Sequence, residues 1–208
     1  MKRSPLLLML TLTALACSIK PTLAADIPET AKKAAEKMAT ETCAACHGPG
    51  GRSIAPTFPH LAAEPPGYIE VQLRAFRDQT RADPDAIAYM WGMASQLDDV
   101  MISALADYYS RQPRPTAKPG DPKLVSAGKL IYEQGVPSKQ VPACSTCHGT
   151  NAQGVGAIPR LAGQHAPYLF KQMLVIQNVL RTAPVMHGVV KDLTRDQMQA
   201  VAAFLASQ

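Results

Sequence analysis

The feature that most constrains this chain is a five-residue motif, Cys-x-x-Cys-His, that occurs twice. Its residues are Cys43, Cys46 and His47 in the first copy and Cys144, Cys147 and His148 in the second. This pattern is typical of c-type haem attachment, in which the two thiols form thioethers with the haem vinyl groups and the adjacent histidine binds the iron. The two copies therefore predict two covalently attached haem c groups, one in each half of the chain.

Two other uses of paired cysteines explain the motifs less well. A thioredoxin-like redox pair occurs near a βαβ pattern, whereas here a histidine follows both pairs and neither half shows that pattern. A structural zinc site needs four ligands, which is more cysteine and histidine than either half offers. Of the five cysteines only Cys17 lies outside the motifs, so no pair remains for a structural disulfide.

The N-terminus has the composition of a secretory signal peptide. Lys2 and Arg3 precede an apolar run over residues 6–16, and Thr22-Leu23-Ala24 ends in a small residue suited to cleavage. We therefore expect a signal peptide at residues 1–24, cleavage after Ala24 and export to the periplasm. The apolar run is short for a membrane span, and no later stretch replaces it. The mature chain is thus expected to lack a transmembrane segment and to contact a membrane surface only transiently.

Cys17 allows a second interpretation of this N-terminus. The preceding residues, Ala14-Leu15-Ala16, loosely resemble a lipoprotein processing site, with alanine where leucine is usual. Lipidation of Cys17 is the alternative; we favour Cys17 as a small apolar residue of a cleaved signal peptide.

After the signal peptide, the second half of the chain repeats the first. Pro-Arg-Leu-Ala at 159–162 matches Pro-His-Leu-Ala at 59–62, and Arg181 matches Arg81. The repeat is domain-sized, which indicates duplication of a whole domain. The expected order is a first domain at residues 25–112, a proline-rich, extended linker at 113–122 and a second domain at 123–208.

Helical patterns account for most of the sequence between these landmarks. Expected helices cover residues 27–42, 66–76 and 98–110 in the first half, and residues 123–134 and those after Thr194 in the second. Asp98 is expected to cap its helix, and Thr194 and Gln197 form a capping box. An all-α fold follows, with two tandem domains that each wrap around one haem.

The repeat also identifies candidates for the second axial ligand of each iron. Aligned without gaps, the C-terminal regions of the two halves place Met90 on Met186, Leu97 on Leu193 and Tyr108 on Phe204. A single methionine is usually core filler, but one that is matched in both halves, on a predicted loop before the last helix, favours ligation. A thioether ligand raises the haem potential. We predict Met90 and Met186 as ligands, with Met93 as the alternative in the first half.

Other residues near these sites leave their roles open. His60 and His187 have no histidine counterpart, which favours surface or packing roles. Tyr68 and Tyr168 are expected to pack, and either can bond to a haem edge. Arg81 and Arg181 either approach the haem propionates or lie on the solvated surface.

The mature chain is nearly neutral, but its charge is uneven. Residues 25–112 carry 8 basic and 12 acidic side chains, and residues 113–208 carry 10 and 4, which gives net charges of −4 and +6. Such asymmetry produces a dipole that can orient the protein toward a charged partner; unselected surface charge is the alternative. Basic residues are not interleaved with aromatic ones, so nucleic acid is not an expected partner.

With both motifs, the Pro-x-Leu pattern and the paired methionines, the chain after residue 24 resembles the dihaem cytochrome c4 family, two class I cytochrome c domains in tandem. The resemblance is strongest over residues 141–149 and 159–164. It implies His/Met ligation, haems near each other across a domain interface, and hydrogen bonds from the proximal histidines to the carbonyls of Pro59 and Pro159. The first half departs from the pattern in its first helix, because Ala34 and Met38 occupy the positions that Gly128 and Tyr132 keep.

These features predict a monomeric periplasmic electron carrier rather than an enzyme. Its expected partners are a quinol-oxidising complex and a terminal oxidase or reductase. The alternative is the cytochrome subunit of a flavin-containing sulfide dehydrogenase, or a dihaem enzyme similar to thiosulfate dehydrogenase. A catalytic haem would need an open or displaceable axial position, and matched methionines in both halves argue against one.

Overall fold

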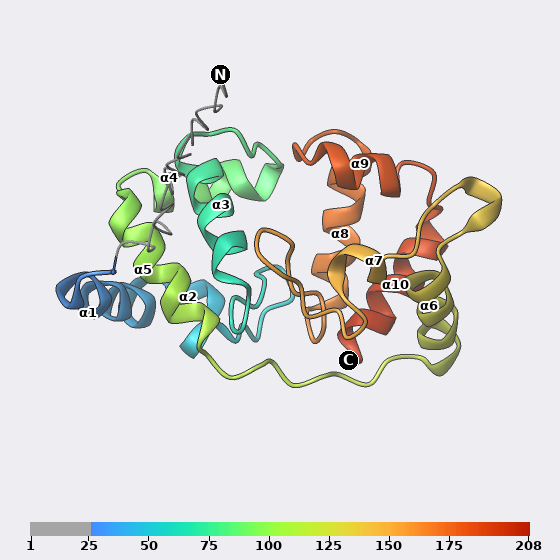
Figure 1. The fold of residues 1–208 in the computed structure, drawn as a ribbon, viewed down its shortest axis with the longest axis horizontal. Coiled ribbons are helices and arrows are strands. Elements are labelled where there is room, and N and C mark those ends of the chain that lie inside the picture. Colours follow the sequence, from blue (N-terminus) through green and yellow to red (C-terminus); the bar gives the residue numbers. More distant parts are fainter. Residues whose placement is uncertain (1–25) are drawn as a thin grey trace, which may run out of the picture.

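The computed structural model describes residues 26–208, so the predicted signal peptide and Cys17 lie outside the described residues. Figure 1 shows two helical halves side by side, joined by an extended segment that runs along one edge of the molecule. Within residues 26–208 no β-strand forms, and the only β-bridges are isolated ones, Val136 with Val141 and Val155 with Ile158. The predicted all-α fold is confirmed.

Each half consists of helices and helical turns in a similar order. The first half contains α1 (Glu29–Met38), η1 (Ala39–Cys43), α2 (Ala44–His47), η2 (Pro49–Gly51), α3 (Pro66–Arg77), η3 (Ala86–Met90), α4 (Trp91–Ala94) and α5 (Asp99–Ser110). The second contains α6 (Pro122–Gln134), η4 (Pro137–Lys139), α7 (Ser145–His148), α8 (Ala166–Gln177), α9 (Pro184–Val190) and α10 (Arg195–Ala206).

The predicted caps of the two C-terminal helices are confirmed. The Asp98 carboxylate accepts the Met101 N–H at 2.7 Å at the start of α5. Thr194 and Gln197 form the full capping box that begins α10. Each cap pairs backbone donors that have no partner inside the helix, which fixes where the helix starts.

The first helix differs from its prediction in length. It continues past Thr42 through the π-helical turn η1 into α2, which carries the first motif. Of the two positions aligned with Gly128 and Tyr132, Ala34 is exposed and Met38 is half-buried against the core. The residues of this helix that are fully buried in the core are Ala35 and Ala39, which are spaced one helical turn apart.

The first half has one apolar core, and the second half has two clusters of buried apolar residues. Ile69, Phe76, Ile102 and Leu105 bring α3 and α5 together in the first half. In the second half Tyr132 of α6 packs with residues of α8 and α10. Helices α6 and α10 cross closely at Gly128, since a Cβ there would lie 2.0 Å from the Ala200 carbonyl oxygen.

Gly128→Ala is expected to destabilise the second half by about 1–3 kcal/mol, because the added methyl forces α6 away from α10. Thermal unfolding of the haem-loaded protein measures the effect. Ser126→Ala, at an exposed position of the same helix, is the control and should stay within about 0.5 kcal/mol of the parent. An equal effect of both substitutions would contradict the close crossing.

The segment between the halves is extended but not free of contacts. Residues 113–121 have no helix or strand, as the prolines predict. The expectation of a largely solvated backbone is wrong at two points, because Pro115 is buried and the Lys118 N–H donates to the Ala206 carbonyl at 2.8 Å. These contacts hold the segment against the second half.

Candidate functional site

The two Cys-x-x-Cys-His motifs lie on matching helical turns, α2 and α7. In both, the first cysteine is half-buried, the second is exposed and the histidine is buried. Gly48 and Gly149 follow the histidines at φ of 73° and 83°. That left-handed conformation suits glycine and turns the chain away from the helix directly after the motif.

Both motif histidines are held by a proline carbonyl. His47 Nδ1 lies 2.9 Å from the Pro59 oxygen, and His148 Nδ1 lies 3.1 Å from the Pro159 oxygen. A carbonyl only accepts, so each Nδ1 carries the proton and each Nε2 keeps a free lone pair for iron. Burial lowers the pKa of both histidines, which favours this neutral form. The contact that the family resemblance implied is present in both halves.

The first cysteine of each motif lies in a partly desolvated environment. Burial raises the pKa of the Cys43 thiol, and it raises that of Cys144 to about 11. A redox-active cysteine of the thioredoxin type has a lowered pKa instead. The shifts at Cys43 and Cys144 therefore argue against thioredoxin-like disulfide exchange at these motifs.

The matched methionines lie on short helices and not on a loop. Met90 ends the π-helical turn η3, and Met186 lies in the first turn of α9. The predicted loop is wrong because Pro84 and Pro184 each occupy the first turn of a helix, where proline is well tolerated. Both methionines are half-buried against the core of their own half, whereas Met93 is 55% exposed.

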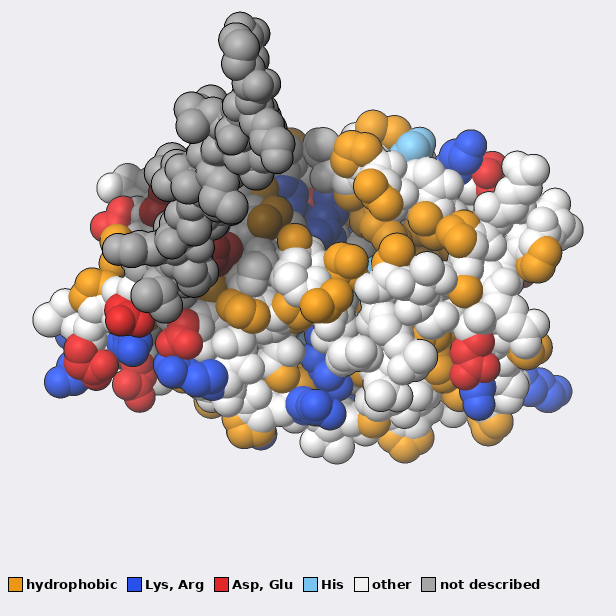
Figure 2. Space-filling model, viewed as in Figure 1, with side chains coloured by type: hydrophobic (Ala, Val, Ile, Leu, Met, Phe, Trp, Pro, Cys, Tyr) orange, Lys and Arg blue, Asp and Glu red, His pale blue; other side chains and the backbone are white. Residues whose placement is uncertain are grey.

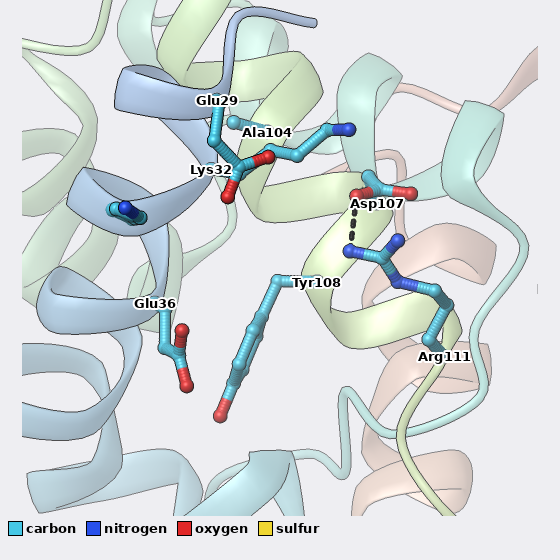
Figure 3. A pocket seen from close by; sticks show the side chains of 8 residues that line it. Glu29, Lys32, Glu36, Ala104, Asp107, Tyr108 and Arg111 are labelled. Atoms are coloured by element: carbon cyan, nitrogen blue, oxygen red, sulfur yellow. Dashed lines mark ion pairs between the residues drawn. The ribbon is translucent and has the colours of Figure 1, made fainter.

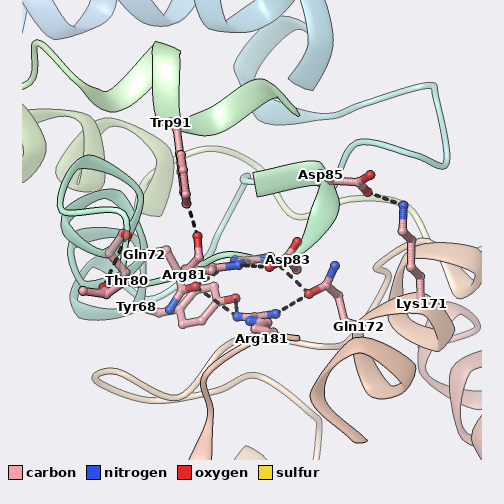
Figure 4. A network of polar contacts seen from close by, with 11 residues as sticks. Tyr68, Gln72, Thr80, Arg81, Asp83, Asp85, Trp91, Lys171, Gln172 and Arg181 are labelled. Atoms are coloured by element: carbon pink, nitrogen blue, oxygen red, sulfur yellow. Dashed lines mark hydrogen bonds and ion pairs between the residues drawn. The ribbon is translucent and has the colours of Figure 1, made fainter. Parts of the chain in front are cut away.

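Arg81 and Arg181 meet in the interior between the halves, so the solvated surface, one of the two alternatives for them, is wrong. Figure 4 shows them together with Gln72 and Gln172. The Gln172 side-chain oxygen accepts from Arg181 at 2.6 Å and from Arg81 at 3.1 Å. The Gln72 oxygen accepts from Arg81 at 2.8 Å and from Arg181 at 3.0 Å. Each glutamine thus bridges both arginines, and the contacts are reciprocal.

This arginine cluster carries more positive than negative charge. Asp83 pairs with Arg81 at 2.7 Å, and the two side chains are 2% and 9% exposed. Arg181 bonds only to neutral groups: the two glutamines and the Tyr68 hydroxyl, which lies at 3.1 Å. A buried charge needs a counter-charge, and guanidinium groups bind carboxylates well. The cluster therefore fits the propionates of haems held near the interface.

Further contacts connect the halves around this cluster. Lys171 of α8 forms an ion pair with Asp85 at its edge (Figure 4). His60 is buried and stacks on His165 with ring centroids 4.0 Å apart. His165 Nε2 in turn lies 3.0 Å from the Ser53 carbonyl, in the loop after the first motif. His60 therefore packs at the interface between the halves, and packing is one of the two roles expected for it.

A polar hollow of about 270 Å³ lies between α1 and α5, away from the motifs (Figure 3). Its lining combines acidic and basic side chains, namely Glu29, Lys32, Lys33, Glu36, Asp107 and Arg111, with Ala104 and Tyr108. Neither motif contributes a residue to it. The hollow is too polar to bury a porphyrin, so it is not part of the haem sites.

The interface was largely missed from sequence. Glu64, Gln164, Ser53 and His165 all make contacts between the halves, and the sequence analysis assigned none of them to an interface. A usable signal existed at Gln72 and Gln172, which match in the repeat as the arginines do. Polar residues that are matched in both halves of a duplication are candidates for the interface between the copies.

Comparison with known proteins agrees with this geometry. The family model described as cytochrome c matches residues 31–110 and again residues 125–208. Cytochrome c-552 of Acidithiobacillus ferridurans is 42% identical over 167 residues, which are 79% of this chain and 73% of that protein. A protein named thiosulfate dehydrogenase electron acceptor, from Thiomonas intermedia, is 39% identical over 80% of this chain and 78% of its own length.

A solved structure gives the same result for the fold. Cytochrome c4 of Acidithiobacillus ferrooxidans superimposes with a TM-score of 0.76 at 41% identity, over 80% of this chain and 98% of that one. In residues 26–208 no helix combines the length and apolar character needed to cross a bilayer.

Proposed function

The chain belongs to the cytochrome c family, with two such domains in tandem, and from that premise we propose that it carries electrons in the periplasm between a quinol-oxidising complex and a terminal oxidase or reductase. The tandem domains hold two covalently attached haem c groups. Bound haem supplies a one-electron couple at its iron. The chain's own residues supply the ligands, hold them in position and neutralise the propionates.

The proposal gives each motif residue one role. The haems are attached through Cys43, Cys46, Cys144 and Cys147. The proximal ligands are His47 and His148, and the distal ligands are Met90 and Met186. The buried imidazoles with an unprotonated Nε2 support the proximal assignment. The half-buried, matched methionines support the distal one. Arg81 and Arg181 are proposed to neutralise the propionates.

One observation favours a carrier over an enzyme: each half offers both a buried histidine and a matched methionine. With His47 and Met90 on one iron and His148 and Met186 on the other, neither iron would have an open site for a substrate. These four residues would supply what an electron carrier needs.

The uneven charge supports docking with a preferred orientation. Figure 2 shows that acidic side chains gather mainly over the first half on the face in view, as expected from its net charge of −4 against +6 for the second. We propose that the carrier acts as a monomer, meets a membrane surface only transiently and uses this dipole to meet its donor and acceptor through different halves.

A second candidate function is service to a sulfur-oxidising enzyme. The relative from Thiomonas intermedia is named as the electron acceptor of thiosulfate dehydrogenase. This chain is 39% identical to it over 80% of its own length, so it is suited to accept electrons from such an enzyme, or to act as the cytochrome subunit of a flavin-containing sulfide dehydrogenase.

Two measurements on the haem-loaded protein separate these functions. The oxidised protein mixed with thiosulfate alone should stay oxidised, whereas turnover of thiosulfate would make it an enzyme and overturn the proposal. Affinity capture from periplasm and membranes, followed by mass spectrometry, should then recover a quinol-oxidising complex or a terminal oxidase. Recovery of a flavoprotein in fixed stoichiometry would instead assign the subunit role.

A further inference from the structure

The two carbonyls that hold the motif histidines belong to peptide groups that also bond to the opposite half. The Pro59 oxygen accepts the His47 Nδ1–H, and the N–H of the same peptide group belongs to His60. That N–H donates to the side-chain oxygen of Gln164, in the second half, at 2.9 Å. One peptide group thus connects His47 to a side chain of the other domain.

The second half has the same arrangement in the reverse direction. The Pro159 oxygen accepts the His148 Nδ1–H, and the N–H of that peptide group belongs to Arg160. It donates to Oε2 of Glu64, in the first half, at 2.9 Å. Glu64 and Gln164 occupy equivalent positions of the repeat, each two residues before the first residue of the following helix, which is α3 for Glu64 and α8 for Gln164.

The two equivalent side chains differ in one chemical respect. Gln164 is a neutral amide whose Nε2 also donates to the His60 carbonyl at 3.0 Å, so its charge is fixed. Glu64 carries a carboxyl group that can lose a proton. The two side chains are almost equally buried, at 5% and 6% exposed, so the difference between them is mainly one of charge.

The surroundings of Glu64 bring the pKa of its carboxyl group close to neutral pH. Burial raises its pKa to about 8, although the Arg160 N–H and the charges of Arg160 and Arg181 oppose that rise. The other titratable groups on this side of the interface are His60, His165, Lys118 and Arg114. Burial lowers the pKa of both histidines, so both are neutral at pH 7 and above. Glu64 is therefore the group there that changes charge between about pH 7 and 9.

We propose that Glu64 is a positioning residue that sets the reduction potential of the haem held by His148. That haem belongs to the half opposite to the one that contains Glu64. Gln164 is the fixed-charge counterpart of Glu64 and acts on the haem held by His47. This inference rests on the proposed function, because it takes the two histidines as proximal ligands.

The physical basis is polarisation along a short chain of hydrogen bonds. A negative charge that accepts the Arg160 N–H makes the Pro159 oxygen a stronger acceptor, since linked hydrogen bonds reinforce one another. His148 then becomes a more basic ligand and stabilises ferric iron, as does the negative charge itself. The potential of that haem should therefore fall as Glu64 ionises. By linkage, reduction raises the proton affinity of Glu64, so at pH values near its pKa an electron from the donor is accompanied by partial uptake of a proton from water by the carboxylate.

The test is spectroelectrochemical titration of the haem-loaded protein from pH 6 to 9.5, with each haem assigned by NMR. In the parent chain the potential of the His148 haem should fall above about pH 8. A tenfold difference in the acid constant of Glu64 between the two iron states corresponds to about 59 mV. E64Q should keep the hydrogen bond and abolish this fall, whereas Q164E should create a pH-dependent potential at the His47 haem.

Glu36→Gln makes the same chemical change at an exposed position of α1 and should leave both potentials unchanged. If both haems are bound with normal spectra but E64Q leaves the pH dependence of the His148 haem intact, or shifts both haems equally, the inference is wrong and the proposed function stands. Loss of low-spin spectra in the parent chain would instead overturn the ligation itself. If E64Q fails to bind two haems, the result with Q164E decides.

Discussion

Met186→Ala is expected to lower the reduction potential of the second haem by on the order of 0.1 V or more, within the roughly 0.8 V range that axial ligation spans, and to leave the first haem unchanged. The thioether favours ferrous iron, so its loss stabilises the ferric state. Spectroelectrochemistry of the haem-loaded protein measures the potential, and the absorption of the methionine–iron bond in the ferric protein reports the ligand directly.

Met90→Ala should have the same effect on the first haem alone. Met93→Ala is the matched control, because Met93 lies three residues later in the chain and is exposed; its removal should change neither potential. If Met93→Ala abolishes the methionine–iron absorption of the first haem and Met90→Ala does not, Met93 is the distal ligand and the assignment of Met90 is wrong.

The double substitution Cys144→Ser and Cys147→Ser is expected to reduce the haem content from two per chain to one. The thioethers are what hold the haem covalently, and the second motif supplies both of them. Tyr132 and Cys144 belong to the same cluster of apolar residues, so loss of the haem should also loosen the second half. Absorbance and intact-protein mass spectrometry measure the haem content, and hydrogen exchange locates the loosening.

Cys17→Ser is the control for this pair and should leave two haems per chain, as expected of a residue that leaves with the signal peptide. A chain that retains two covalent haems after the double substitution would show that the second motif is not an attachment site. Loss of both haems would show that the halves cannot mature independently.

The parts of the fold that follow local rules were predictable from sequence. Asp98 and Thr194 set the starts of α5 and α10 through their own side chains. These features depend on residues a few positions apart, so the sequence contains all of the information.

Other features depend on how distant segments pack and could not be predicted in this way. The first helix continues into the first motif through the π-turn η1, and nothing in the composition of residues 39–43 signals that turn. The burial of Arg81 and Arg181 is decided by the docking of the two halves. From sequence alone, a charged residue suggests a solvent-exposed position. Its burial becomes evident only when the residues that contact it from the other half are known.

The reciprocal arginine–glutamine contacts have a consequence for the origin of the chain. Arg81 bonds to Gln172 and Arg181 bonds to Gln72, so the same pair of residues is used twice, once from each side. That pattern defines an isologous dimer interface. The chain therefore has the form of a homodimer whose subunits have been fused, and the fusion fixes their stoichiometry at one to one. Once joined, the two copies can diverge in sequence. They differ at the equivalent positions 64 and 164, where one copy has glutamate and the other has glutamine.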